Sequence, residues 1–274
     1  PSMPSSWIVL SLAIHSHEST HRILPDGGEG VWVRRTKTDT GAPHVAPEQH
    51  WGWAYQILPY CELQDIWELE DDAQVAQNEI SMHYCPSRRA PTLVMNLGNG
   101  PGWAQRQLRG MLDYAANAGT DCLYINAWGI RGPGTTAPII QRPKERTRRL
   151  KDSIGFQHIT DGLANTLLLG EKLMNAARVG EEDLGDDDAG FAEGWDFDTV
   201  RWGCYPPGPD IQDPAMPAHR QAYKELRGGF GPSHPGGFNG ALCDASVRRI
   251  SFNIDFNLFK DLSNRHDGNA VSLE

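Results

Sequence analysis

The sequence predicts one α+β domain with long loops. Three observations support this prediction: apolar residues recur at helical spacing near the N-terminus, two short apolar runs near the C-terminus indicate a β-hairpin, and neither a repeat nor a linker divides the 274 residues. The 29 Gly and 19 Pro indicate many turns between these elements. A chain of this length can bury about 70 to 75% of the surface that its unfolded form exposes. It therefore needs no disulfides or metal ions in order to fold.

The first predicted element is an amphipathic helix over residues 6–22. Trp7, Leu10 and Ile14 recur at the spacing of one helix face, and one of the serines at positions 5 and 6 supplies the N-cap. The Pro-Asp-Gly-Gly sequence that follows at 25–28 ends the helix.

Further elements follow along the chain. The apolar run WGWAYQILPY begins at Trp51 and predicts a helix that continues to Leu69. A buried strand is predicted over Thr166–Leu169, ending at Gly170–Glu171. The hairpin consists of Phe238–Cys243 and Val247–Phe252, joined by three turn residues.

Charge and hydropathy exclude several classes of partner. The net charge of −10, from 25 Lys and Arg against 35 Asp and Glu, argues against nucleic acid and against an anionic membrane. The longest apolar stretch, Trp7 to Ile14, is shorter than the roughly 20 residues of a membrane helix, and no basic segment precedes it. We therefore expect a soluble chain that has no membrane contact and carries no export signal in the sequence as given.

The five cysteines leave two alternatives open. They contain no C-x-x-C pair, which excludes a zinc ribbon and a thioredoxin-like motif. Two disulfides with one free thiol would suit an exported protein, whereas buried thiols would suit any compartment. The cysteines are Cys61, Cys85, Cys122, Cys204 and Cys243.

An acidic segment spans residues 180–198. Carboxylates on a flexible loop suit calcium, for which Asp186, Asp188 and Asp196 are the candidate ligands. A solvated surface loop is the favoured alternative. The Pro-rich segment 202–217 that follows is expected to lie over the surface.

Carboxylates and aromatic residues also suggest carbohydrate chemistry. Glu171 and Glu193 are candidates for the two carboxylates that a glycoside hydrolase needs. Polysaccharide lyases instead need a base, for which His234 is a candidate, and a cation that neutralises a uronate. The remaining candidates are Trp195 and Trp202 for stacking on sugar rings, Arg201 for the cation and Tyr223 for an alternative base.

His234 and Asp244 flank the first strand of the predicted hairpin. We expect their side chains to meet if the glycines at 236–237 fold back. A hydrogen bond from the imidazole to the carboxylate would pin the hairpin or orient a general base, and the structural role is the favoured one. These two residues are nevertheless the first candidates for a site, because polar residues on a turn-rich rim are usually exposed.

Six segments, taken in order, resemble one family. They resemble the planctomycete-type pseudopilin-like proteins with the H-x(9)-D-G signature, a domain of unknown function. The signature residues here are His234 and Asp244, and Ala245 replaces the glycine. Since alanine disfavours positive φ by about 1 kcal/mol, we expect a different turn type. The segments are HSHESTHRILP (15–25), GWAYQILPY (52–60), CPS (85–87), DYAANAGT (113–120), ITDGLANTLLLGEK (159–172) and GPSHPGGFNGALCDASVRRIS (231–251).

The resemblance implies a pilin-like fold, in which an N-terminal helix packs on the antiparallel sheet of a globular head. Residues 1–274 would form one such head, with the remainder of a membrane-anchoring helix at about 6–22. Residues 180–230 would be a loop-rich insertion, and residues 231–274 a C-terminal hairpin and tail. The protein would be exported, extracellular or at the cell surface, with the prepilin signal and the membrane-embedded half of the helix missing from this sequence.

The function implied by the resemblance is assembly or ligand and glycan binding at the cell surface. The expected partners are proteins of a surface or type II secretion assembly, or a polysaccharide. Pseudopilins of the secretion type commonly hold calcium in a loop, which agrees with the acidic segment. A carbohydrate-active enzyme on the same scaffold, either a hydrolase or a lyase, is the alternative, because a fold does not fix a function.

Overall fold

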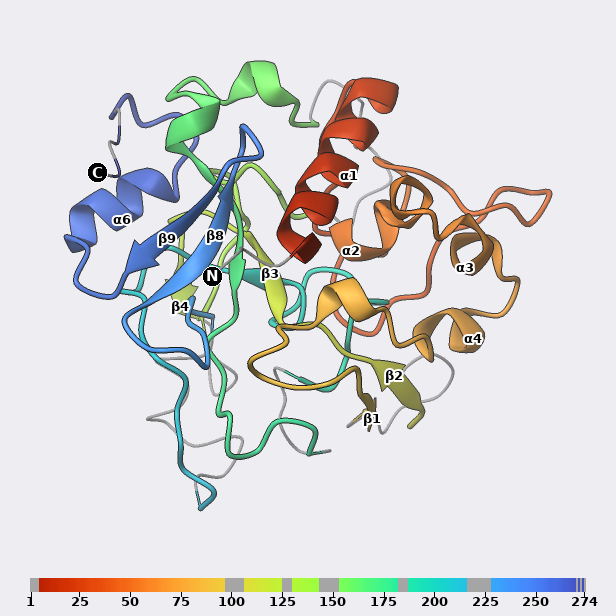
Figure 1. Cartoon of the computed structure of the whole chain (residues 1–274). Coiled ribbons are helices and arrows are strands. Elements are labelled where there is room, and N and C mark those ends of the chain that lie inside the picture. The colour runs from red at the N-terminus through yellow and green to blue at the C-terminus, as the bar shows by residue number, and fades with distance from the viewer. Residues whose placement is uncertain are drawn as a thin grey trace.

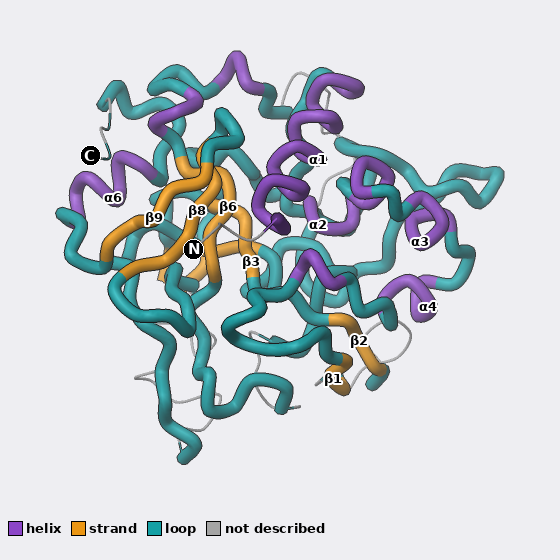
Figure 2. Tube along the Cα trace, in the orientation of Figure 1, coloured by secondary structure: helices purple, strands orange, loops and turns teal. Residues whose placement is uncertain are grey.

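The structure is a computed structural model that describes residues 5–96, 106–124, 130–142, 153–181, 187–215, 228–269, 271 and 273. It has the mixed α/β character that the sequence predicts, with a long N-terminal helix beside antiparallel and mixed sheets (Figure 1). Loops connect most of these elements (Figure 2). Within the described ranges, no helix is both long enough and apolar enough to cross a membrane.

The main sheet has five strands in the order β7-β3-β6-β8-β9. All neighbours pair antiparallel except β3 and β7, which pair parallel. Two small two-stranded sheets, β1-β2 and β4-β5, lie outside it. The strands are β1 (Leu93–Met95), β2 (Leu108–Gly110), β3 (Tyr114–Asn117), β4 (Leu123–Tyr124), β5 (Ile130–Arg131), β6 (Leu167–Glu171), β7 (Val200–Arg201), β8 (Gly237–Leu242) and β9 (Val247–Ser251).

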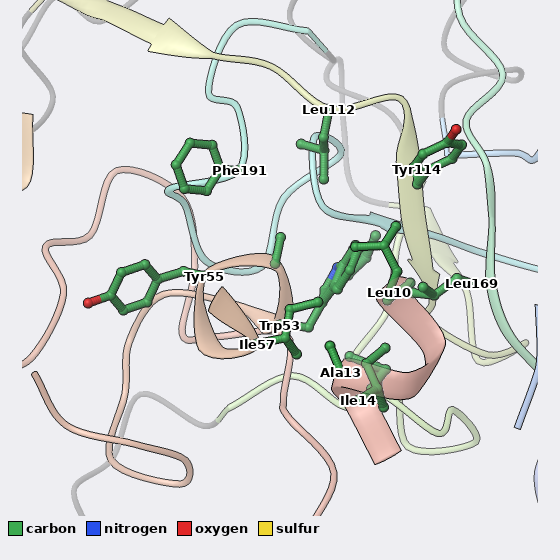
Figure 3. Packing of buried hydrophobic residues seen from close by; sticks show 14 of the residues in the cluster. Leu10, Ala13, Ile14, Trp53, Tyr55, Ile57, Leu112, Tyr114, Leu169 and Phe191 are labelled. Atoms are coloured by element: carbon green, nitrogen blue, oxygen red, sulfur yellow. The ribbon is translucent and has the colours of Figure 1, made fainter. Parts of the chain in front are cut away.

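Helix α1 (Ser5–His21) matches the predicted helix within one residue at each end. Trp7, Leu10 and Ile14 are fully buried, so the face identified from its spacing is the face that packs inward. The Trp7 ring lies against Tyr114 of β3 with 4.5 Å between ring centroids. Figure 3 shows this helix directing its apolar side chains at Leu169 of β6 and at the region of Trp53.

The other face of the main sheet has its own apolar cluster. Phe230 stacks on Phe238 of β8 with 5.6 Å between centroids, and both rings meet Phe259 edge-on. Phe259 belongs to α6 (Phe256–Leu262), whose N-cap is Asp255. In Figure 1, α6 and α1 lie on opposite sides of the β8–β9 hairpin. The sheet is therefore covered on both faces.

The helix predicted from Trp51 to Leu69 is broken. Pro59 lies in the second of three short segments and has no N–H to continue a helix, so the chain turns there. Glu62 then adopts a left-handed φ of 60° before the next helix. The short helices in this region are α2 (Trp53–Gln56), η1 (Leu58–Cys61), α3 (Gln64–Glu68), α4 (Asp72–Ala76) and η2 (Ser81–His83), and later in the chain η6 (Phe156–His158) and η7 (Leu163–Asn165) follow.

The acidic segment is not the solvated surface loop that was the favoured expectation. The described residues 187–202 are almost all buried, and they supply β7 to the main sheet. Carboxylates of this segment form ion pairs with buried basic side chains. For example, Arg109 Nη1 lies 3.2 Å from Glu193 Oε2. Charge pairing therefore lets an acidic sequence enter the core, which composition alone did not indicate.

The predicted hairpin is confirmed, although its turn differs from the expectation. β8 and β9 pair from Gly237↔Ser251 to Ala241↔Val247. Ala245 N donates to Leu242 O at 3.0 Å, and Ala245 itself has a φ of 67°. The alanine thus takes the left-handed position that usually favours glycine, and the turn keeps its positive φ.

Candidate functional site

The candidate site is centred on Glu171, the last residue of β6. Its side chain is buried, with a relative exposure of 1%. One carboxylate oxygen accepts the backbone N–H of Asn239 at 2.7 Å, and the Cys85 thiol donates to the other at 3.4 Å. Both oxygens lie within 3.1 Å of His234 Nε2. A buried carboxylate with this many donors is fully hydrogen-bonded.

His234 is the part of this cluster that solvent can reach. Its side chain keeps 21% of its surface exposed, and the segment before β8 holds it over Glu171. Nε2 is committed to Glu171, and the Asn239 side-chain amide lies 3.1 Å from the same nitrogen. Nδ1 is not buried and has no hydrogen-bond partner among the described residues. The carboxylate therefore orients the ring while the second nitrogen stays open.

Cys85 lies beneath the pair and acts as a hydrogen-bond donor. Its Sγ is 3.0 Å from Ser87 Oγ, and its backbone N–H donates to Asp113 at 2.8 Å. Burial raises the pKa of this thiol, and the neighbouring Glu171 raises it further. The thiol is therefore protonated at neutral pH, a state that does not favour a nucleophile.

Arg88 joins the segments that surround the cluster. Its buried guanidinium contacts both oxygens of Asp210, at 3.0 and 3.1 Å. It also donates to the carbonyl oxygens of Asp113, Lys172 and Gly231. One arginine thus fixes four stretches of chain that are far apart in the sequence.

These contacts bring together four of the six segments that carry the resemblance. Cys85 comes from CPS, Asp113 from DYAANAGT, Glu171 from ITDGLANTLLLGEK, and His234 from the glycine-rich segment before β8. Besides the pairing of their strands, residues of these four segments meet at one polar junction. We define the Glu171 junction as Cys85, Ser87, Arg88, Asp113, Glu171, His234 and Asn239.

The structure does not bring His234 and Asp244 together. They lie at opposite ends of β8, whose six extended residues span about 20 Å. Asp244 is exposed in the hairpin turn, where its Oδ1 accepts the N–H of Ser246 at 2.9 Å. Glu171, and not Asp244, is the carboxylate that contacts His234.

Four of the residues predicted to bind or cleave a glycan are buried in the core, namely Trp195, Trp202, Arg201 and Glu193. Trp195 and Trp202 have relative exposures of 3% and 1%, and their rings meet edge-on at 5.9 Å. Arg201 is fully buried and donates to the carbonyl of Phe197. Glu193 pairs with Arg109, and burial raises its pKa to about 7. These placements argue against sugar stacking and against Glu193 as an exposed catalytic carboxylate.

Two of the predicted site residues, Asp186 and Tyr223, lie outside the described residues. Asp188 and Asp196 are buried at 4% and 5% exposure. The described part of the chain contains no group of three His, Cys, Asp or Glu residues placed to hold a metal ion. Calcium binding therefore stays a prediction.

Chemically, the Glu171 junction can do two things. It pins β6, β8 and the Cys85 loop to one another, which is a structural role. It also presents an imidazole whose Nε2 is fixed by a carboxylate, which is the arrangement of a general base or of a ligand-contacting histidine. Sequence reasoning identified His234 and Glu171 separately and missed Cys85, Arg88 and Asn239, although CPS was among the segments that carried the resemblance.

Comparison with known proteins gives one family. No curated protein and no solved structure matches the chain. The model of a family described as a protein of unknown function, DUF1559, matches residues 8–257. That range covers most of the 274 residues and includes all seven residues of the Glu171 junction. The chain therefore belongs to the DUF1559 family.

Proposed function

We propose that this chain is the globular head of an exported, pseudopilin-like surface protein that assembles with copies of itself through the outer face of α1. One observation carries the proposal. Ile8, Val9 and Leu12 have relative exposures of 51%, 38% and 55%, and they lie side by side on the first turns of the helix. They are three of the five large apolar side chains that are exposed in the described part of the chain.

The outer face of α1 changes character along the helix. Residues 5–14 include no charged side chain, whereas the exposed residues of the second half are Ser16, Ser19 and Thr20. The inner face is already packed on the sheet, so the helix carries apolar residues on two sides only in its first half. A contiguous apolar surface of this kind is typical of an interaction site.

A second copy of the same helix is the partner that fits this surface. Two copies can pack Ile8 and Leu12, spaced by four residues, into each other's grooves. No charge has to lose its hydration, and each fully buried Ile or Leu side chain contributes about 1.5 to 3 kcal/mol. The resemblance to pilin-like proteins, whose N-terminal helices serve in assembly, supports the same partner.

Two further features bear on the proposal. Cys122 and Cys204 form a disulfide, which supports export because disulfides persist in oxidising compartments. Glycan binding has less support, since Trp195, Trp202 and Arg201 are buried. The assembly role is therefore preferred over glycan recognition.

Sedimentation velocity over a range of concentrations tests the proposal. We expect the chain to self-associate, and the double variant Ile8→Gln/Leu12→Gln to remain monomeric. The matched control Ser16→Gln/Ser19→Gln changes the polar half of the same face and should associate like the parent. Association that survives the first variant, or a parent that stays monomeric at millimolar concentration, would contradict the proposal.

Acid–base chemistry on a polysaccharide is a second candidate, favoured by the Glu171–His234 pair with its open Nδ1. In that case His234 would remove a proton next to a uronate carboxylate, as a lyase requires. Uronate polysaccharides incubated with the chain should then yield 4,5-unsaturated products that absorb in the ultraviolet, and His234→Ala should abolish them. Absence of product across such a panel would exclude this candidate.

A further inference from the structure

A buried lysine lies next to two buried aspartates in the core. Lys172 follows Glu171 directly, and its side chain is fully buried. Its Nζ lies 3.9 Å from Asp187 Oδ1 and 3.9 Å from Asp198 Oδ1, and both carboxylates are also fully buried. A primary amine and two carboxyl groups are thus placed together away from solvent.

The two carboxyl groups have different partners. Asp187 accepts two charge-assisted hydrogen bonds from Arg89, Nη1 to Oδ2 at 2.5 Å and Nη2 to Oδ1 at 2.7 Å. Asp198 accepts backbone N–H bonds from Ala189 at 3.2 Å and from Gly190 at 3.0 Å. Each Asp198 oxygen therefore has one backbone donor, which can stabilise negative charge that develops on it.

Burial also shifts the pKa values of the amine and of the carboxyl group toward their neutral forms. It lowers the pKa of Lys172 against the attraction of Asp198 and Asp187. It raises the pKa of Asp198 to about 6 despite the nearby Lys172. A neutral amine is a nucleophile, and desolvation is one of the ways in which proteins activate lysine.

We propose that Lys172 and Asp198 form an intramolecular isopeptide bond in the core of this protein. Lys172 Nζ attacks Cγ of the protonated Asp198 carboxyl group, while the N–H groups of Ala189 and Gly190 stabilise the charge that develops on its oxygens. Asp187 takes a proton from Nζ and passes it to the departing hydroxyl. The C–N bond forms, the C–O bond breaks and one water leaves, so the step consumes neither oxidant nor reductant.

Proximity of the two reacting groups also favours the reaction. The fold holds the amine and the carboxyl group together, which replaces an encounter in solution by an intramolecular step. The product would link the end of β6 to the segment immediately before β7. Both strands flank β3 in the main sheet, so the bond would tie the edge strand β7 to the central strand β6.

The intact mass of the full chain, unfolded without reductant, tests the proposal. We expect a mass below that of the sequence by one water molecule and by the two hydrogens of the Cys122–Cys204 disulfide. Lys172→Arg should lose only the two hydrogens, while the control Lys260→Arg should behave like the parent. After tryptic digestion, a branched peptide should join Lys172 to Asp198, with no cleavage after Lys172.

Succinimide formation at Asp-Gly sequences also removes one water, and the chain has three of these, at Asp26, Asp161 and Asp267. Loss of water that persists in Lys172→Arg, with no branched peptide in the parent, would assign the loss to such a site and overturn the proposal. A parent mass that retains the water would overturn it as well. The parent mass and the branched peptide decide the question even if Lys172→Arg fails to fold.

Discussion

His234 Nε2 lies 3.0 Å from the carboxylate of Glu171, although 63 positions separate the two residues in the sequence. The contact joins the end of β6 to the loop before β8. It also joins a buried carboxylate to an imidazole that keeps 21% of its surface exposed.

Glu171→Gln should lower the free energy of unfolding by about 2 to 3 kcal/mol. The glutamine side chain has one acceptor oxygen and one NH₂ group in place of two acceptor oxygens. It therefore could not accept hydrogen bonds from His234, Asn239 and Cys85 together, and its NH₂ group would face a donor. Asp244→Asn, at the exposed turn, should change stability by less than about 0.5 kcal/mol. Urea unfolding of both variants measures the difference, and equal losses would contradict the assignment of Glu171 as the partner of His234.

His83 should make the fold sensitive to acid. It is 1% exposed, its ring nitrogens have no partner within the described residues, and burial lowers its pKa to about 3. In the unfolded chain the imidazole binds a proton at about pH 6.5. The free energy of unfolding is therefore unaffected by His83 above that pH, and it falls by about 1.4 kcal/mol per pH unit as the pH drops toward 3.

His83→Leu should remove that part of the pH dependence. Stability at pH 7 should change by no more than about 1 kcal/mol, because an apolar side chain replaces unpaired nitrogens next to Phe191. His266→Leu, at an exposed position, is the control and should leave the profile unchanged. Thermal unfolding between pH 7 and 4 gives the profiles, and parallel curves for parent and His83→Leu would refute the prediction.

Ala245→Gly should stabilise the hairpin. Ala245 has a φ of 67°, a conformation that costs an L-residue about 1 to 2 kcal/mol, and the greater freedom of glycine in the unfolded chain offsets part of the gain. We expect a net increase of about 0.5 to 1 kcal/mol. Ala241→Gly, a buried position in β8, should destabilise, and guanidinium unfolding of the two variants should give changes of opposite sign.

The disulfide should account for two of the five cysteines. Cys122 and Cys204 are paired, whereas Cys61, Cys85 and Cys243 are free and buried. Thiol titration of the unfolded, unreduced chain should therefore find three thiols. Cys122→Ala/Cys204→Ala should cost about 2 to 4 kcal/mol and abolish the effect of reductant on the melting temperature. Five thiols in material made under oxidising conditions would contradict the pairing.

Periodicity was sufficient to predict α1, β6 and the hairpin, because each of these elements has a continuous local pattern. It was insufficient for residues 187–202, whose carboxylates enter the core only because Arg89, Arg109 and Lys172 come from distant segments. The same limit applies to the site. The sequence identified His234 and Glu171 as polar candidates, but a pairing across 63 positions depends on the sheet order.

Site-directed cross-linking tests assembly through α1 most directly. The three free cysteines are buried, so Leu12→Cys adds an accessible thiol to the outer face of the helix, and Ser19→Cys adds one to its polar half. Under mild oxidation we expect Leu12→Cys to form a disulfide-linked dimer rapidly and Ser19→Cys to form little. Equal, slow cross-linking of the two variants would contradict assembly of the head through this face of α1.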